Sequence, residues 1–144
     1  DATETIDAGF AAMASGDLET AALEAALALR SDPRNPRARY LFGQVQYSQG
    51  GHGRAVDYLL AAVQQPDATP AMWYALALAL RDNRQLPEAI QVLETCLRLE
   101  PGNVEVLLTL LELAERVGAT EIARDVLQCL QQAAPDDPRV LAMS

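Results

Sequence analysis

The chain divides into four consecutive blocks of 34 residues, and this internal period constrains its fold more than any other feature of the sequence. The blocks are 2–35, 36–69, 70–103 and 104–137. Position 20 of every block is alanine, at Ala21, Ala55, Ala89 and Ala123. A period of this length is typical of stacked supersecondary units, because no single unit can bury its apolar face alone. We therefore expect one stacked domain over residues 1–144, with its function on the surface of the stack.

Turn chemistry marks the boundaries within and between the blocks. In the third block Thr69 precedes Pro70, and an N-cap residue followed by proline is typical of a helix start. The sequence predicts a first helix over 71–80, a turn at 82–84 and a second helix from Pro87 to about Leu99. Cap residues also end the other blocks, at Asn35, Asn103 and Asp137, and glycine holds position 15 in three blocks, at Gly16, Gly50 and Gly118. Each block is thus predicted to form two helices joined by a short turn.

The block pattern resembles the tetratricopeptide repeat family, whose units carry Trp, Leu-Gly and Tyr in the first helix, then Ala, Phe and a closing Pro. The third block matches best, with Trp73, Leu76, Ala77, Leu80, Ala89, Leu93 and Pro101. The first block has Ala8, Gly9, Ala12, Ala25, Ala28 and Pro33, and the second has Phe42, Gly43, Leu59 and Ala62. The fourth block has Leu107, Leu110, Leu127, Leu130 and Pro135, but places Leu111 where a small residue is usual. The resemblance covers residues 2–137 and implies an all-α, right-handed superhelical solenoid.

Composition excludes several classes of partner. The net charge is -9 and every basic residue is arginine, so no basic stripe is available to follow a nucleic-acid backbone. The longest apolar run, Ala71 to Leu80, is too short to span a bilayer. Cys96 and Cys129 lie 33 residues apart in helical segments, a spacing that is typical of neither a metal site nor a disulfide framework. We expect no nucleic acid and no membrane span, and the sequence does not determine the compartment.

No set of residues in the sequence predicts catalysis. The single histidine, His52, lies among Gly50, Gly51 and Gly53, which we interpret as the turn between the helices of the second block. It has no evident second ligand, base or orienting carboxylate. The glycines follow no predicted strand and precede no Gly-Lys-Ser or Gly-Lys-Thr, so a phosphate loop is not indicated. We expect a protein that is not an enzyme, with no catalytic residue, no metal and no cofactor.

The family resemblance implies a binding groove on the concave face. In such arrays, side chains at positions 2, 5, 9, 12 and 13 of each first helix usually line that face. Carried over to this sequence, they give a predicted peptide-binding set of Phe10, Arg37, Tyr40, Gln44, Tyr47, Tyr74, Leu78, Arg81, Leu108 and Glu112. The lining grades from apolar to acidic, which suits a peptide with apolar anchors and a basic end. The alternative for the aromatic residues is that they pack between neighbouring helices.

A chaperone-type groove is not expected. Family members that hold a C-terminal carboxylate use a clamp of lysine, asparagine and arginine. The corresponding places here are Ile6, Phe10, Leu41, Ala71 and Ala75, or Tyr40, Gln44, Ala75, Glu105 and Thr109 one block later. Neither alignment of the clamp positions retains a basic clamp. A protein that binds the C-terminal tail of a chaperone is therefore disfavoured.

Three function classes follow from these predictions. The first is a scaffold that binds a peptide or a partner protein, within a larger bacterial protein or an assembly or secretion complex. The second is a regulatory or substrate-docking arm of a multidomain transferase or hydroxylase. The third is a self-associating module that forms homo-oligomers through exposed terminal helices. Residues 138–144 are predicted to start a further or capping helix, and we expect the natural protein to continue beyond them.

Overall fold

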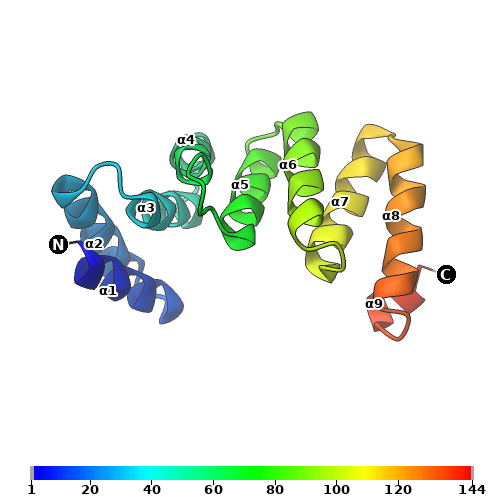
Figure 1. Cartoon of the computed structure of the whole chain (residues 1–144), viewed down its shortest axis with the longest axis horizontal. Coiled ribbons are helices and arrows are strands. Elements are labelled where there is room, and N and C mark those ends of the chain that lie inside the picture. Colours follow the sequence, from blue (N-terminus) through cyan, green and yellow to red (C-terminus); the bar gives the residue numbers. More distant parts are fainter. Residues whose placement is uncertain (1, 144) are drawn as a thin grey trace.

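The computed structural model describes residues 2–143, and within them the chain forms nine α-helices and no strand. The helices are α1 (Thr3–Ala14), α2 (Leu18–Ser31), α3 (Pro36–Ser48), α4 (His52–Val63), α5 (Pro70–Asp82), α6 (Leu86–Leu99), α7 (Val104–Val117), α8 (Thr120–Ala133) and α9 (Pro138–Leu141). They follow one another along an elongated stack (Figure 1). This arrangement confirms the predicted all-α solenoid. Ser144 lies outside the described residues.

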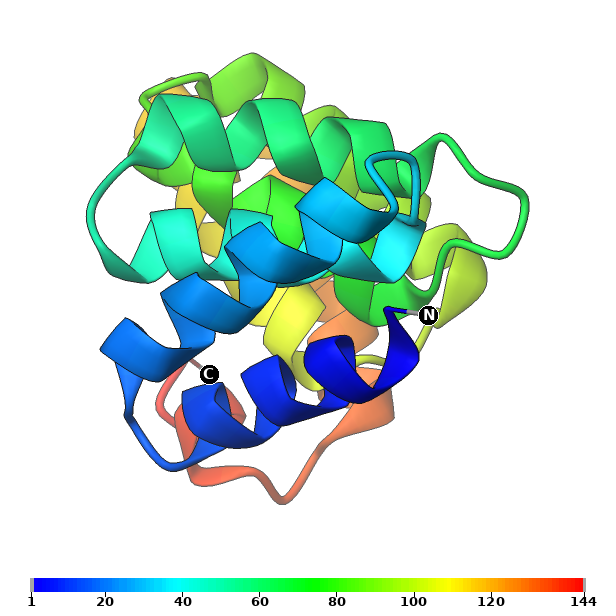
Figure 2. The same cartoon turned by 90° about the vertical axis from the view of Figure 1, so that its left-hand side faces the viewer.

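Each unit is a helix pair that packs on the next pair. Within a unit the first helix packs on the second, and the second helix then packs on the first helix of the following unit. Figure 2, which looks along the stack from the α1–α2 end, shows the later helices behind this pair. Ala21, Ala55 and Ala89 are fully buried at these contacts, whereas Ala123 is half-buried. Small side chains at position 20 therefore allow the close helix approach on which the stack depends.

The predicted caps form at every boundary between units. The side chains of Asn35, Thr69, Asn103 and Asp137 all accept hydrogen bonds from backbone N–H groups of the helix that follows. The helices of the third unit differ slightly from their predicted bounds. Helix α5 includes Asp82, which the sequence placed in the turn, and α6 starts at Leu86 rather than at Pro87. The proline is thus the second residue of its helix, where its missing N–H costs no internal hydrogen bond.

The turn between the two helices of each unit contains one residue in the left-handed conformation. Gly16, Gly50 and Gly118 have φ of 81°, 83° and 74°. Arg84 holds the same position in the third unit with φ of 64°. Because a side chain in this conformation costs roughly 1–2 kcal/mol, the turn geometry of the repeat persists against a local penalty at Arg84.

The face of α1 that points away from the stack is acidic and exposed, whereas the corresponding faces of α3, α5 and α7 are buried. Glu4 and Asp7, at positions 3 and 6 of the first unit, are exposed. The residues at the same two positions of the later units are buried: Ala38, Leu41, Met72, Ala75, Val106 and Thr109. In those units the buried side chains cover the preceding helix pair. The α1 face has no preceding pair among the described residues, and its charges are compatible with water.

Candidate functional site

A first hollow lies where α1, α3 and the start of α5 meet on the first-helix side of the stack. Its lining is Phe10, Arg37, Tyr40, Asp67, Thr69 and Met72. The rings of Phe10 and Tyr40 are 5.6 Å apart, and the Arg37 guanidinium lies 5.5 Å above the centre of the Phe10 ring. Arg37 also pairs with Asp7 at 3.0 Å, and Gln44 Nε2 donates to the Tyr40 hydroxyl at 3.0 Å. The structure therefore brings together four of the ten predicted groove residues.

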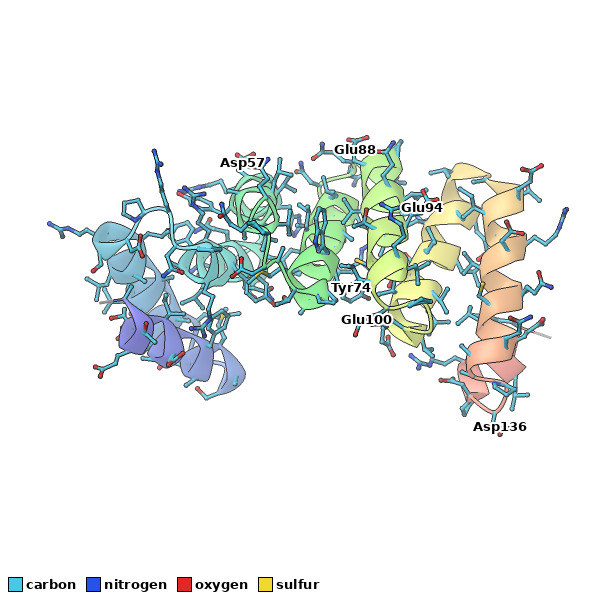
Figure 3. The ribbon with its side chains drawn as sticks, viewed as in Figure 1. Asp57, Tyr74, Glu88, Glu94, Glu100 and Asp136 are labelled. Atoms are coloured by element: carbon cyan, nitrogen blue, oxygen red, sulfur yellow. The ribbon has the colours of Figure 1, made fainter. Side chains whose placement is uncertain are left out.

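A second hollow repeats this arrangement one unit further along. It is lined by Thr69, Pro70, Ala71, Tyr74, Glu100, Asn103 and Glu105. Tyr74 stands at the position of Tyr40 in the preceding unit, and Figure 3 shows it on the same side of the molecule as Glu100. The Glu105 carboxylate is held by Arg139 at 2.8 Å. Both hollows include the exposed residue Thr69, so they adjoin there, and the second hollow has the more acidic lining.

Tyr47 and Arg81 lie in a polar network with Asp82, near the C-terminal ends of α3 and α5. The Tyr47 hydroxyl donates to the Asp82 carboxylate, which also accepts from Arg81 Nε at 2.8 Å. The Arg81 guanidinium holds the pKa of Asp82 below its usual range. Burial, reinforced by the Asp82 carboxylate, raises the pKa of Tyr47. These groups satisfy one another across two units, so the network joins the units instead of presenting free hydrogen-bonding groups.

The remaining predicted groove residues contribute less to the two hollows. Leu78 is half-buried on α5, one turn after Tyr74. Leu108 is half-buried and packs against the main core cluster. Glu112 is exposed and lies 3.7 Å from Arg116 one turn later on the same helix. Neither hollow includes any of the three, so their place in a binding groove stays a prediction.

Sequence reasoning missed the loop residues of the groove. Asp67, Thr69, Glu100 and Asn103 line the hollows from the segments between units. The predicted groove residues all lie on the first helices of their units. The sequence did contain a signal for some of these loop residues. A cap residue at position 34 of a unit must lie beside the start of the first helix of the next unit.

The interpretation of His52 as a turn residue is wrong. His52 is the first residue of α4, and only Gly50, among the glycines around it, has the left-handed backbone of the turn. Its half-buried ring lies 5.5 Å from the Tyr47 ring, at the edge of the polar network. Gly51 serves as the N-cap, and the helix begins without a side-chain cap. The glycine cluster therefore belongs partly to a helix.

The described residues offer no set of side chains for a metal ion, and their cysteines are unpaired. Across residues 2–143, no group of three or more His, Cys, Asp or Glu side chains could hold a metal ion. Burial raises the pKa of the Cys96 thiol to about 11, so this sulfur stays protonated at neutral pH. Cys129 is exposed, and both cysteines are free. None of the helices in this region is long and apolar enough to cross a membrane.

Two family models match parts of this chain. A family model described as anaphase-promoting complex, cyclosome, subunit 3 matches residues 14–96, and one described as tetratricopeptide repeat matches residues 80–144. No curated protein matches the sequence significantly.

Solved structures share the architecture at low sequence identity. YrrB, described as a tetratricopeptide repeat protein with an unusual peptide-binding site, is 19% identical with a TM-score of 0.87, covering 97% of this chain and 72% of its own. MamA from Desulfovibrio magneticus RS-1 is 21% identical with a TM-score of 0.85, covering 96% and 78%. PilF from Pseudomonas aeruginosa is 24% identical with a TM-score of 0.81, covering 98% and 64%. These likenesses establish the fold, and together with the family models they show that the chain belongs to the tetratricopeptide repeat family.

Proposed function

We propose that this protein is a non-catalytic scaffold that binds an extended peptide segment of a partner protein along the groove formed by the two hollows. The observation that carries the proposal is that the two hollows adjoin. Tyr40 and Tyr74 hold the same position in successive units, each lines one hollow, and Thr69 belongs to both. A peptide in extended conformation can place side chains in both hollows, because peptide recognition commonly uses pockets spaced along a groove.

The two halves of the groove favour different side chains. The first half is lined by the half-buried rings of Phe10 and Tyr40, which suit an apolar or aromatic anchor. The second half has Tyr74 beside Glu100, which makes no ion pair with another described residue and suits lysine or arginine, whereas Glu105 is already paired with Arg139. The preferred segment therefore carries an apolar anchor at one end and a basic residue at the other.

Selection from a random peptide library tests this proposal directly. The protein is compared with a Tyr40→Ala, Tyr74→Ala variant and with a Tyr58→Ala control. Tyr58 lies on α4 and contacts Phe42, so its removal deletes a tyrosine outside the groove. Circular dichroism verifies that all three proteins remain helical.

We expect the library to yield peptides with an apolar and a basic residue. Their binding is expected to be lost in the double variant and retained in the control, because only the double variant removes groove side chains. Selected peptides that bind the double variant as tightly as the original protein would place recognition elsewhere on the molecule and refute the proposal.

A further inference from the structure

A third hollow lies away from the groove, between the second helices of the last two units. We call it the α6–α8 crevice, and its volume is about 360 Å³. Its lining is Glu94, Leu97, Arg98, Leu107, Leu110, Ile122, Asp125, Val126 and Cys129. The leucines of α7 are buried at its floor, while the charged residues are exposed at its rim. No residue of this crevice lines either half of the groove.

Comparison of the third and fourth units explains why the floor of the crevice is apolar. Position 4 of the third unit is Trp73, a half-buried side chain packed against the main core, whereas the same position of the fourth unit is Leu107. A leucine fills much less space than an indole. Position 19 is the exposed Glu88 in the third unit and the half-buried Ile122 in the fourth. The fourth unit thus replaces a bulky group by a smaller one and a charged group by an apolar one.

The rim of the crevice carries one carboxylate on each side. Glu94 is on α6, where Figure 3 labels it, and Asp125 is on α8. Both are exposed, and neither makes an ion pair with another described residue. The Arg98 guanidinium donates to Thr95 Oγ1 at 2.8 Å on its own helix. The two carboxylates therefore remain available to a cation beside the crevice.

We propose that the α6–α8 crevice is a second binding site, which takes one bulky apolar side chain, preferably aromatic, flanked by lysine or arginine from a partner protein. The apolar floor takes the ring, and Glu94 and Asp125 take the flanking cations. The site works independently of the groove, because the two share no lining residue. It allows this scaffold to hold a second partner segment while the groove is occupied.

The probe is the blocked tripeptide acetyl-Arg-Trp-Lys-amide, titrated into isotopically labelled protein and followed by amide chemical shifts. We expect saturable shifts on α6 and α8. Acetyl-Arg-Ala-Lys-amide tests the need for the ring, and acetyl-Glu-Trp-Glu-amide tests the need for the cations. Neither control peptide is expected to shift these residues at the same concentrations.

Two substitutions give the fourth unit the residue types that the third unit has at positions 4 and 19. Leu107→Trp fills the floor, and Ile122→Glu makes it polar; either is expected to abolish the shifts. Because a buried substitution can disturb folding, a Glu94→Gln, Asp125→Asn variant provides a surface test. It is expected to weaken binding by about tenfold, the combined effect of two exposed charge pairs. Tyr40→Ala, which removes a side chain that lines the groove and not the crevice, is expected to bind the tripeptide unchanged.

Several outcomes would overturn the assignment. Shifts located in the groove and lost in Tyr40→Ala would identify the tripeptide as a groove ligand. Equal binding by Ile122→Glu, or no shift on α6 and α8 up to the solubility limit of the tripeptide, would show that the crevice takes no such side chain. Shifts on α6 and α8 that grow with protein concentration alone would identify a second copy of the chain as the occupant.

Discussion

Two joints between successive units are bridged by a tyrosine hydroxyl that reaches 35 residues forward, yet their chemistry differs. At the joint of the second and third units, Tyr47 donates to the Asp82 carboxylate, which Arg81 also binds. At the joint of the third and fourth units, Tyr74 lies 2.8 Å from Thr109 Oγ1, which itself donates to a backbone carbonyl at 2.9 Å. The first joint is therefore charged, and the second is neutral.

A tyrosine on the first helix of one unit can thus bind either a charged or a neutral partner in the next unit. A hydrogen bond to a charged group is stronger than one between neutral groups, but it depends on the protonation state of that group. We therefore expect the charged joint to weaken in acid, where the Asp82 carboxylate loses its charge. The neutral joint, which lies beside the second hollow, is made of hydroxyl groups and a backbone carbonyl, and its hydrogen bonds involve no ion pair.

The largest expected effect comes from breaking the charged joint. Asp82→Ala leaves the half-buried Arg81 and Tyr47 without their shared partner, and we expect a loss of roughly 2–3 kcal/mol in the free energy of unfolding. Urea unfolding followed by circular dichroism measures it. Asp57→Ala is the matched control, because Asp57 is exposed on α4 and its removal should change stability by less than about 0.5 kcal/mol. Equal losses of unfolding free energy in both variants would show that the polar network does not stabilise the fold.

The pH dependence of stability separates the two joints further. The pKa of Asp82 is lowered in the folded protein, so its contribution is present above the unfolded pKa of about 4 and disappears as pH falls through the lower folded value. We expect stability to fall below about pH 4 in the original protein and to fall less steeply in Asp82→Asn. Urea midpoints between neutral pH and pH 3 provide the measurement. Parallel curves for the two proteins would contradict a folded-state shift at Asp82.

The smallest expected effect comes from the neutral joint. Thr109→Val keeps the shape of the side chain and removes the hydroxyl that faces Tyr74, which is half-buried and can turn to water. We expect a loss of about 0.5–1 kcal/mol in the free energy of unfolding, and no change in how this free energy depends on pH. The same urea series reports both quantities. A loss as large as that of Asp82→Ala would remove the distinction between the joints.

The repeat, the caps and the burial pattern could be predicted from the sequence because they depend on local spacing. Asn35, Thr69, Asn103 and Asp137 cap their helices as expected, since a cap needs only the right residue before a helix. Arg84 was expected in the predicted turn at 82–84. Its left-handed backbone was not, because propensity disfavours it and only the geometry of the whole unit imposes it.

The contacts that cross units could not be predicted in the same way. Helical position indicates that Tyr47 and Tyr74 face the same side, but not which partner each hydroxyl finds. That choice depends on rotamers and on residues a whole unit away, such as Asp82 and Thr109. The α6–α8 crevice was missed for a related reason, since it arises from a difference between equivalent positions in two units and not from any residue alone.

The acidic face of α1 has a consequence for growth of the stack. Every interior joint is a heterologous contact, in which two different surfaces meet, and the same contact repeated between molecules would build an open filament. At such a contact through the α1 face, the carboxylate of Glu4 would have to leave water, which costs several kcal/mol for an unpaired charge. Asp7 is already paired with Arg37 in the same molecule, so this ion pair would be buried with it. We therefore expect a contact between copies that buries the α1 face to be disfavoured.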